Sequence, residues 1–401
     1  MEFPVDNPLP TDLSKEAFFL SASNLEPATR TLNFPKLHMD PPPMTDYAAE
    51  TATLASWSVR TSRALFFSLL GGLLLCVGFA VQSVFLGEGE VRKLRVAHTL
   101  PEQHPVHRGI ARFAERLAVL SGGRLTVTVF ANGQLGSETQ YLEQLQSGTL
   151  DIAKVSAAPM GNFVPAFQVF SVPFLFPDET ARWRALESAA GQELLHATIT
   201  RRADGSPSGL VGLAYYDAGA RSFYAKEPIP GPEAIRGRKW RVMSDVIAMD
   251  MVDALGGSPT PIAFAELYSA LTQGVVDGAE NNPPSLLSSR HYEVSRHYSL
   301  TEHMAIPDVL VMSARARARL TPEQQAWVNQ AAVESALYQR ALWAEETAAA
   351  LQQLRKLGVE VTTPDRAAYT ARTARVLASR HDTPLGAWAE RLRVASQLAS
   401  P

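Results

Sequence analysis

The chain has 401 residues, enough for two domains of ordinary size, and its hydrophobic fraction of 46% is sufficient for real cores. The formal net charge of -3 is nearly balanced, and no basic stripe with interleaved aromatic residues occurs, so nothing indicates nucleic acid as a partner. Cys76, the one cysteine, lies inside the most apolar stretch, which excludes intramolecular disulfides, thiol nucleophiles and cysteine-ligated metals from the rest of the chain.

The first ninety residues have the pattern of a leader for export. Residues 1–60 are rich in Pro, Ser and Thr with little periodicity, so we expect them to be disordered, unless translation begins later, for instance at Met44. Residues 61–90 hold an apolar run with arginines before it and acidic residues after it, which fits a signal peptide or a membrane anchor. The run is long enough to span a bilayer. Its glycines and the Gln82-Ser83 pair favour cleavage over retention as an anchor, and Gly78-Phe79-Ala80 is a plausible cleavage site.

Strand and helix patterns alternate over the next sixty residues. Alternating apolar residues predict strands, and apolar residues at helical spacing predict helices. In chain order we predict a strand at 94–97, a helix at 107–120, a strand at 125–130, a helix from 137 to 148 and a strand at 151–155. This order indicates an α/β domain with a largely parallel sheet, whose ligands bind beyond the C-terminal ends of the strands. His98, Glu138 and Ser156 fall near such ends.

The pattern recurs in the second half of the chain. We predict strands at 210–215 and 240–243, helices at 244–255 and 266–273, and a strand at 275–278. Two α/β units without a long linker predict two lobes that face each other across a cleft. A further strand at 309–312 is expected to cross back to the first lobe.

The C-terminal region is predicted to be helical. Thr321 and Gln324 form a capping box, so a helix begins there and runs to about Leu357, and a last helical stretch begins at 363–365. We therefore divide the chain after the leader into a first lobe, residues 91–215 with about 308–401, and a second lobe, residues 216–307.

Two arginines and an acid-amide pair carry the most specific chemistry. Arg221 and Arg241 precede the step Glu280-Asn281. A guanidinium offers donors in a planar fork that matches a carboxylate. A lone arginine is more often a surface charge, but two forks beside an amide indicate a pocket for a small organic acid.

The sequence lacks the common motifs of metal sites, nucleophiles and nucleotide binding. His291, His297 and His303 are spaced six apart, whereas helical metal ligands need spacings of three or four, so a zinc site is disfavoured and no metal is expected. No nucleophile elbow, phosphate loop or dinucleotide fingerprint occurs, and no cofactor is expected. Asp277 could in principle be a catalytic carboxylate, but a solvated or capping role is the simpler interpretation. This pattern favours binding without turnover.

Several ordered motifs carry a family resemblance. They are GQLG at 133–136, VPFLF at 172–176, GRKWRVM at 237–243, LGG through Pro at 255–261, ELYSAL at 266–271 and GVVDGAEN at 274–281. With them, roughly residues 92–390 resemble the solute-binding proteins of tripartite ATP-independent periplasmic (TRAP) transporters, the dicarboxylate-type (DctP-like) family. The family fold is periplasmic binding protein-like, with two α/β lobes around a cleft, joined by crossing strands and a long helix, that close by hinge motion.

The resemblance implies roles for individual residues. Arg241 is similar to the residue that makes the bidentate bond to the substrate carboxylate, and Arg221 to a second cationic contact. Asn281 is similar to an amide that binds the substrate or orients Arg241. The remaining substrate-binding candidates are Glu280, Asn282, Glu138, Ser156, Phe170, Tyr216 and His98.

The resemblance also implies a function. A receptor of this family binds an organic acid anion in the periplasm and delivers it to TRAP-type membrane permease subunits. The extended form at 280–284, followed by SRHYE at 289–293, is similar to a branch associated with sugar acids such as uronates or aldonates, with Asn282 expected to serve hydroxyls. C4-dicarboxylates and 2-oxo acids stay open as ligands. The alternatives are a periplasmic enzyme using Glu138 or Asp277, and a sensor tethered by the apolar run at 64–86.

Overall fold

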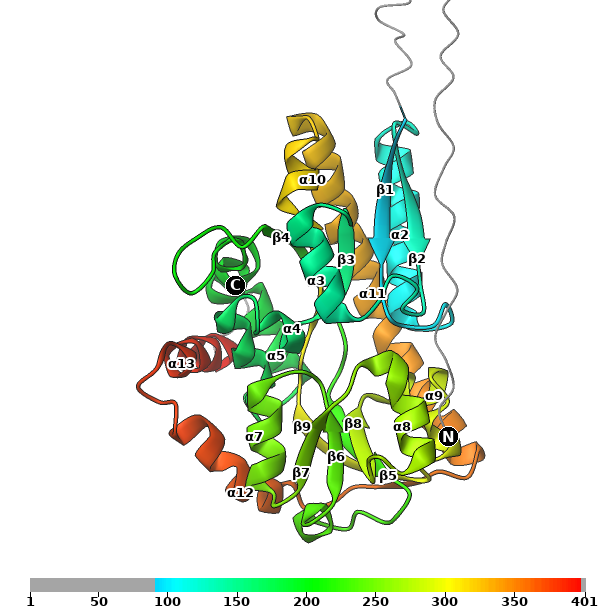
Figure 1. Cartoon of the computed structure of the whole chain (residues 1–401), viewed down its shortest axis with the longest axis vertical. Helices are drawn as coiled ribbons and strands as arrows, with labels where there is room; N and C mark the ends of the chain where they lie inside the picture. Colours follow the sequence, from blue (N-terminus) through cyan, green and yellow to red (C-terminus); the bar gives the residue numbers. More distant parts are fainter. Residues whose placement is uncertain (1–90, 398–401) are drawn as a thin grey trace, which may run out of the picture. The chain divides into compact units, whose positions relative to one another are not determined.

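The computed structural model describes residues 91–397. The interpretations of residues 1–60 and 61–90, and Cys76 with them, lie outside the described residues. Within the described range, no helix combines the length and the apolar character that crossing a membrane requires. The described residues form two sheets flanked by helices, each the centre of one lobe (Figure 1). The predicted α/β fold is confirmed.

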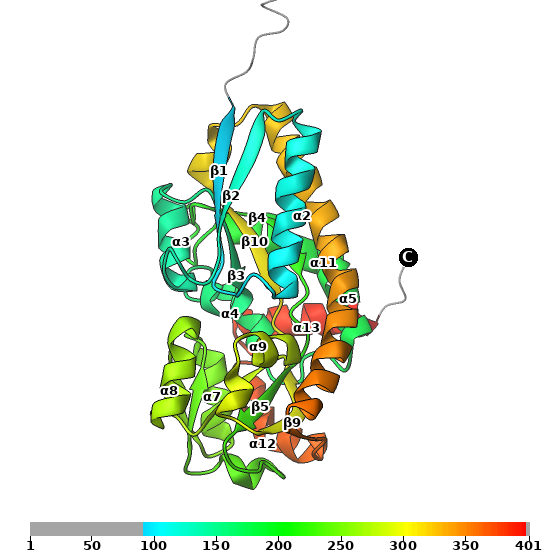
Figure 2. The ribbon, with the colours of Figure 1, turned by 90° about the vertical axis from the view of Figure 1, so that its right-hand side faces the viewer.

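The first lobe is built on a five-stranded sheet in which one strand, β10, runs antiparallel to its neighbours. In spatial order its strands are β2 (Leu125–Phe130), β1 (Arg92–Ala97), β3 (Ile152–Ser156), β10 (Asp308–Ser313) and β4 (Leu210–Tyr216). Helix α2 (Pro105–Leu120) packs against β2 and against α11 (Pro322–Lys356), while α3 (Glu138–Ser147) packs on β3 from the other face (Figure 2).

The second lobe is built on a six-stranded sheet in which one strand, β5, runs antiparallel to its neighbours. In spatial order its strands are β11 (Glu360–Thr362), β9 (His297–Met304), β5 (Arg221–Ala225), β8 (Gly278–Asn281), β6 (Lys239–Val242) and β7 (Ser258–Pro261). Helix α7 (Val246–Ala254) packs on β6 and β7, and α12 (Arg366–Ala378) packs on α7 and β9.

Shorter elements complete the two lobes. They are α4 (Ala157–Met160), η1 (Pro165–Ser171), α5 (Glu179–Glu187), α6 (Ala189–His196), η2 (Thr198–Thr200), η3 (Pro232–Ile235), η4 (Phe264–Glu266), α8 (Leu267–Gln273), α9 (Pro283–Ser288), η5 (His291–Glu293), α10 (Ala314–Ala318) and α13 (Pro384–Gln397). Helix α13 packs against α5, α6 and η1 of the first lobe.

Two crossings and one long helix connect the lobes. The chain passes from β4 to β5 through residues 217–220 and returns from β9 to β10 through residues 305–307. The strand that follows each crossing is the antiparallel member of its sheet. Helix α11 contacts α2 and β4 in the first lobe and α9 and β11 in the second, and Figure 2 shows it running beside both.

The first crossing is held by side chains from two helices. The buried carboxylate of Asp217 accepts from Arg182 Nη2 at 2.7 Å and from Trp183 Nε1 at 2.9 Å, both on α5. Gln339 on α11 accepts from the Asp217 N–H at 2.7 Å and donates to its carbonyl at 2.9 Å. Because Asp217 is fixed from both sides, we expect hinge rotation to be taken up by residues 218–220.

Gly219, in this crossing, is tightly packed, and its replacement tests that packing. Its φ of +62° lies in the left-handed region, and a Cβ at this position would lie 2.9 Å from Trp343 Nε1. Gly219→Ala should therefore combine a backbone cost of about 1–2 kcal/mol with an overpacking cost of about 1–3 kcal/mol. Gly122, with φ +58° and no atom within 4 Å of a built Cβ, is the matched control. Equal losses of Tm in the two alanine variants would contradict the close contact.

Local sequence signals place most element ends correctly. Thr321 and Gln324 form the predicted capping box of α11, which ends at Lys356, one residue before the predicted Leu357. Ser137 caps α3 in the same way. The strand predicted at 125–130 coincides with β2. These ends are encoded locally, because capping hydrogen bonds and alternation of apolar residues involve near neighbours in the chain.

Three expectations differ from the structure. The strand predicted at 275–278 begins only at Gly278, because Val275 is 46% exposed and Val276 and Asp277 still belong to the turn that follows α8. The last helical stretch is two helices, α12 and α13. The C-terminal region also does not lie wholly with the first lobe, since β11 pairs with β9 and α12 packs on the second sheet.

Candidate functional site

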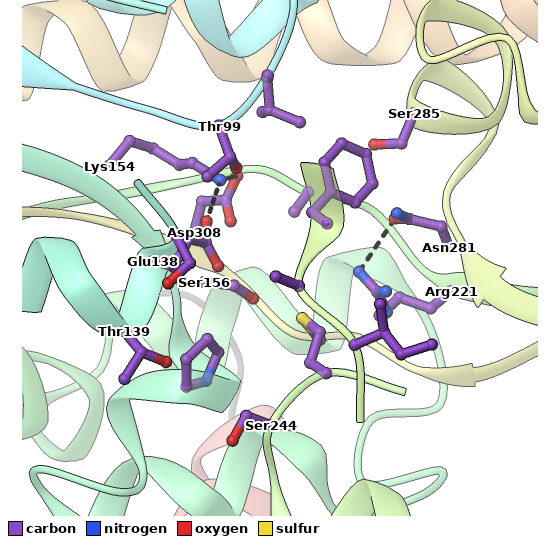
Figure 3. Close-up of a pocket in the computed structure, with 18 of the residues that line it drawn as sticks. Thr99, Glu138, Thr139, Lys154, Ser156, Arg221, Ser244, Asn281, Ser285 and Asp308 are labelled. Carbon is purple, nitrogen blue, oxygen red and sulfur yellow. Dashed lines mark hydrogen bonds and ion pairs between the residues drawn. The ribbon is translucent and has the colours of Figure 1, made fainter. Parts of the chain in front are cut away.

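A cavity of about 310 Å³ lies between the lobes (Figure 3). The first lobe contributes residues from the ends of β1 and β3, from the start of β10 and from the starts of α2 and α3, and the second lobe contributes residues from β5, β6, β8 and α9. The polar side chains of its wall are Thr99, His104, Ser137, Glu138, Thr139, Lys154, Ser156, Arg221, Arg241, Ser244, Asn281, Asn282, Ser285 and Asp308. The volume suits a small ligand.

Arg221, the first residue of β5, already has an internal counter-charge. Its Nε and Nη2 donate to the two carboxylate oxygens of Glu280 at 2.5 and 2.9 Å, and Nη2 also donates to the Glu280 carbonyl at 2.9 Å. Its Nη1 donates to Asn281 Oδ1 at 3.0 Å. Five N–H groups are available on a guanidinium, so few donors are left for a ligand.

Glu280 is fully buried behind Arg221 and is absent from the cavity wall. Burial alone would raise the pKa of Glu280, but the charge of Arg221 and the adjacent His303 outweigh it and lower this pKa to about 2. The expected substrate contact by Glu280 is therefore not what the structure shows. Its carboxylate neutralises and orients Arg221, because β8 turns the side chain toward β5 rather than toward the cleft.

Arg241 differs from Arg221 in lacking a counter-ion. It lies on β6, is 2% exposed, and donates from Nε to the Ile262 carbonyl at 2.9 Å. Among residues 91–397 it forms no ion pair, and its buried Nη1 has no hydrogen-bond partner. Burial lowers the pKa of Arg241. A buried cation with an unpartnered donor at a cavity wall is costly unless an anion joins it.

Asn281 and Asn282 make different hydrogen bonds at the cavity. Asn281 Oδ1 accepts from Arg221 and from the Asn282 N–H at 2.9 Å, which leaves the Asn281 amide nitrogen available to a ligand. Asn282 caps α9, since its Oδ1 accepts from the Ser285 N–H at 2.9 Å, and its Nδ2 donates to the Ala218 carbonyl at 2.9 Å. The expected recognition of hydroxyls by Asn282 is thus limited to one N–H and one remaining acceptor position of Oδ1, because the fold uses the other groups.

A buried charge cluster faces these residues from the first lobe. Lys154 on β3 donates to Glu138 at 2.9 Å and lies 3.2 Å from Asp308, as Figure 3 shows. Burial alone would lower the pKa of Lys154, but the two carboxylates outweigh it and raise the pKa to about 12. Burial raises the pKa of Asp308 to about 6, against the pull of Lys154. The cluster carries one more negative than positive group when all three are ionised.

Sequence reasoning found Glu138 but missed Lys154 and Asp308. A signal was present, since Lys154 interrupts an otherwise apolar strand whose five residues are all buried. A lysine in such a strand needs partners. Asp308 becomes a partner of Lys154 only because β10 follows the return of the chain from the second lobe and pairs with β3. No local sequence pattern reveals this pairing.

Three other candidates lie outside the cavity wall. His98 is fully buried and bonds to His107, although its neighbours Thr99 and Leu100 do line the cavity. Tyr216 bonds to Ser335 on α11, and Phe170 packs against Tyr215 in the core. Ser156, as expected, is in the wall.

The catalytic alternatives are not brought together. The Asp277 carboxylate accepts from the Lys239 N–H at 2.7 Å, and Asp277 is not part of the cavity wall. Glu138 is engaged by Lys154. Across residues 91–397 there is no group of three or more His, Cys, Asp or Glu side chains placed to hold a metal ion.

Comparisons with known proteins agree with this geometry. Residues 96–381 match the family described as bacterial extracellular solute-binding protein, family 7. A solute-binding protein of Chromohalobacter salexigens is 35% identical over 274 residues, which cover 68% of this chain and 80% of that one.

Solved structures extend the likeness to the fold. A TRAP periplasmic solute binding protein from a Sulfitobacter species, with bound β-D-galacturonate, is 38% identical with a TM-score of 0.71 and covers 76% of this chain and 100% of that one. A sugar acid binding protein from Advenella mimigardefordensis, in complex with galactonate, is 30% identical with a TM-score of 0.73 and covers 78% and 99%.

Proposed function

This chain belongs to family 7 of the bacterial extracellular solute-binding proteins, and we propose that it binds a sugar acid, a uronate or an aldonate, and delivers it to a TRAP-type membrane permease. The observation that carries the proposal is the buried guanidinium of Arg241, which faces the cavity without a counter-ion among the described residues. The carboxylate of the ligand would supply that counter-ion in a two-bond fork.

The first lobe favours hydroxyls over a second carboxylate. Glu138 and Asp308 offer acceptor oxygens to the cavity, and Lys154 is held between them. Sugar hydroxyls can donate to those oxygens, whereas a second carboxylate would be repelled by them. A polyhydroxylated monocarboxylate therefore fits the cavity better than a C4-dicarboxylate. Bound galacturonate and galactonate in similar proteins support the same ligand class.

A ligand screen tests this assignment. Galacturonate, glucuronate and galactonate at about 100 times their Kd should stabilise the protein by roughly 2.7 kcal/mol, which corresponds to about 4 °C in Tm for a protein of this size. Succinate and malate at the same concentration should shift Tm much less. A dicarboxylate that stabilises as strongly as the best sugar acid would contradict the proposed role of Glu138 and Asp308.

The two alternatives predict different observations. An enzyme acting on sugar acids would change the ligand, so recovery of unmodified ligand after long incubation separates a receptor from an enzyme. A tethered sensor would keep the apolar run at 64–86. Shortened protein in the soluble periplasmic fraction excludes that tether and supports free delivery to the permease.

A further inference from the structure

His104 occupies an unusual place, as both a helix cap and a cavity residue. It is the N-cap of α2, and its Nδ1 accepts from the Val106 N–H at 3.2 Å. Burial and the nearby Lys154, with His98 and His107, lower the pKa of His104 well below its usual value, so the ring is neutral. A neutral imidazole with an accepting Nδ1 carries its hydrogen on Nε2.

The Nε2 of His104 points at the other lobe. It lies 3.2 Å from Ser285 Oγ on α9, so His104 is the donor and Ser285 the acceptor in this bond. Both side chains are nearly fully buried, and both belong to the cavity wall. The hydroxyl of Ser285 has no other hydrogen-bond partner among the residues that the structure describes.

One hydroxyl has a single hydrogen and two acceptor positions. With one acceptor position occupied by His104, the hydrogen of Ser285 must turn elsewhere, and the cavity is the open direction. Figure 3 shows Ser285 at the edge of the cavity on the same side as Asn281. This hydrogen is thereby available to an acceptor oxygen of a ligand.

We propose that His104 is a positioning residue for sugar-acid binding, which holds Ser285 so that its hydroxyl donates to a ligand oxygen. The inference rests on the proposed function. Because His104 belongs to the first lobe and Ser285 to the second, the bond joins the lobes as they stand around the cavity. The ring of His104 also packs on Trp343 of α11, with centroids 5.7 Å apart, and Trp343 lies beside the hinge residue Gly219.

A double-mutant cycle tests this role. His104→Asn keeps a good N-cap for α2 but removes the Nε2 donor. His104→Asn and Ser285→Ala should each weaken galacturonate or glucuronate binding roughly 3- to 10-fold, the effect of one hydrogen bond. The double variant should bind no more than about twofold more weakly than Ser285→Ala alone. Ser288→Ala on the same helix, outside the cavity wall, is the control and should bind normally.

The readouts separate positioning from a structural role. Isothermal titration gives the affinities, and the ligand-free Tm of His104→Asn reports whether the cap is kept. Losses that multiply in the double variant, or unchanged affinity with a lowered ligand-free Tm, would overturn the inference. A wild-type protein that binds no sugar acid would overturn the proposed function and this inference together, whereas normal wild-type binding with unchanged variants overturns the inference alone.

Discussion

Replacement of Arg241 with alanine is expected to weaken sugar-acid binding by about 30-fold to several-thousand-fold. The physical reason is the removal of one member of a buried charge pair, which costs about 2–5 kcal/mol or more. Arg241 is the wall arginine without an internal counter-ion in the described part of the chain, so its charge is compensated mainly by the ligand. Isothermal titration with galacturonate or glucuronate measures the change.

Two variants sharpen this test. Arg241→Lys keeps the charge but loses the planar fork, so it should recover only part of the lost affinity. Arg236→Ala removes a nearby exposed arginine that does not line the cavity, and it should bind as the wild type does. Removal of Arg241 should also relieve an unpaired buried charge in the ligand-free protein. Normal ligand affinity in Arg241→Ala would refute the assignment of the anchor.

Replacement of Glu280 with glutamine is expected to destabilise the fold by about 3–5 kcal/mol, the usual cost of leaving a buried charge unpaired. Arg221 would lose its counter-ion while staying 5% exposed. Urea unfolding at neutral pH measures the loss. Glu266→Gln is the matched control, since Glu266 lies exposed in the same lobe and makes no capping bond, and its stability should be unchanged.

The pH dependence of the free energy of unfolding tests the role of Glu280 independently. Its pKa is lowered from 4.5 to about 2 in the folded protein, so it contributes stability above pH 4.5 that is lost as the pH falls toward 2. By this linkage its contribution is about 3 kcal/mol. Between about pH 5 and pH 2, Glu280→Gln should therefore lose less stability than the wild type. If the stabilities of the wild type and of Glu280→Gln fall in parallel over this pH range, Glu280 is not the group whose protonation destabilises the protein.

Local rules predicted the parts of the fold that local physics determines. The capping box at Thr321, the helix start at Ser137 and the alternation in β2 were each predicted from residues only a few positions apart, and the structure has all three in place. The short strands of the second lobe were harder to predict from the sequence. β9 went unpredicted because its pairing partners, β5 and β11, lie far away in sequence, and pairing rather than propensity stabilises it.

The residues of the candidate site also differ in whether local sequence could predict them. Arg221, Arg241 and Asn281 could be predicted because their residue types and flanking motifs point to carboxylate recognition, and all three lie in the cavity wall. The counter-ion of Arg221 could not be predicted, because the pairing of β5 with β8 decides which arginine Glu280 neutralises. The role of His104 could not be predicted either, since its partner Ser285 is 181 positions later in the chain.

The placement of β10 has a consequence for biosynthesis. This strand separates β3 from β4 in the first sheet, yet in the chain it comes after strands β5 to β9 of the second lobe, which end at Met304. Until Asp308–Ser313 has been made, β3 and β4 each present an open edge, which is a template for wrong pairing. A fragment that stops at residue 307 would therefore be aggregation-prone, and the two lobes mature as one unit rather than in succession.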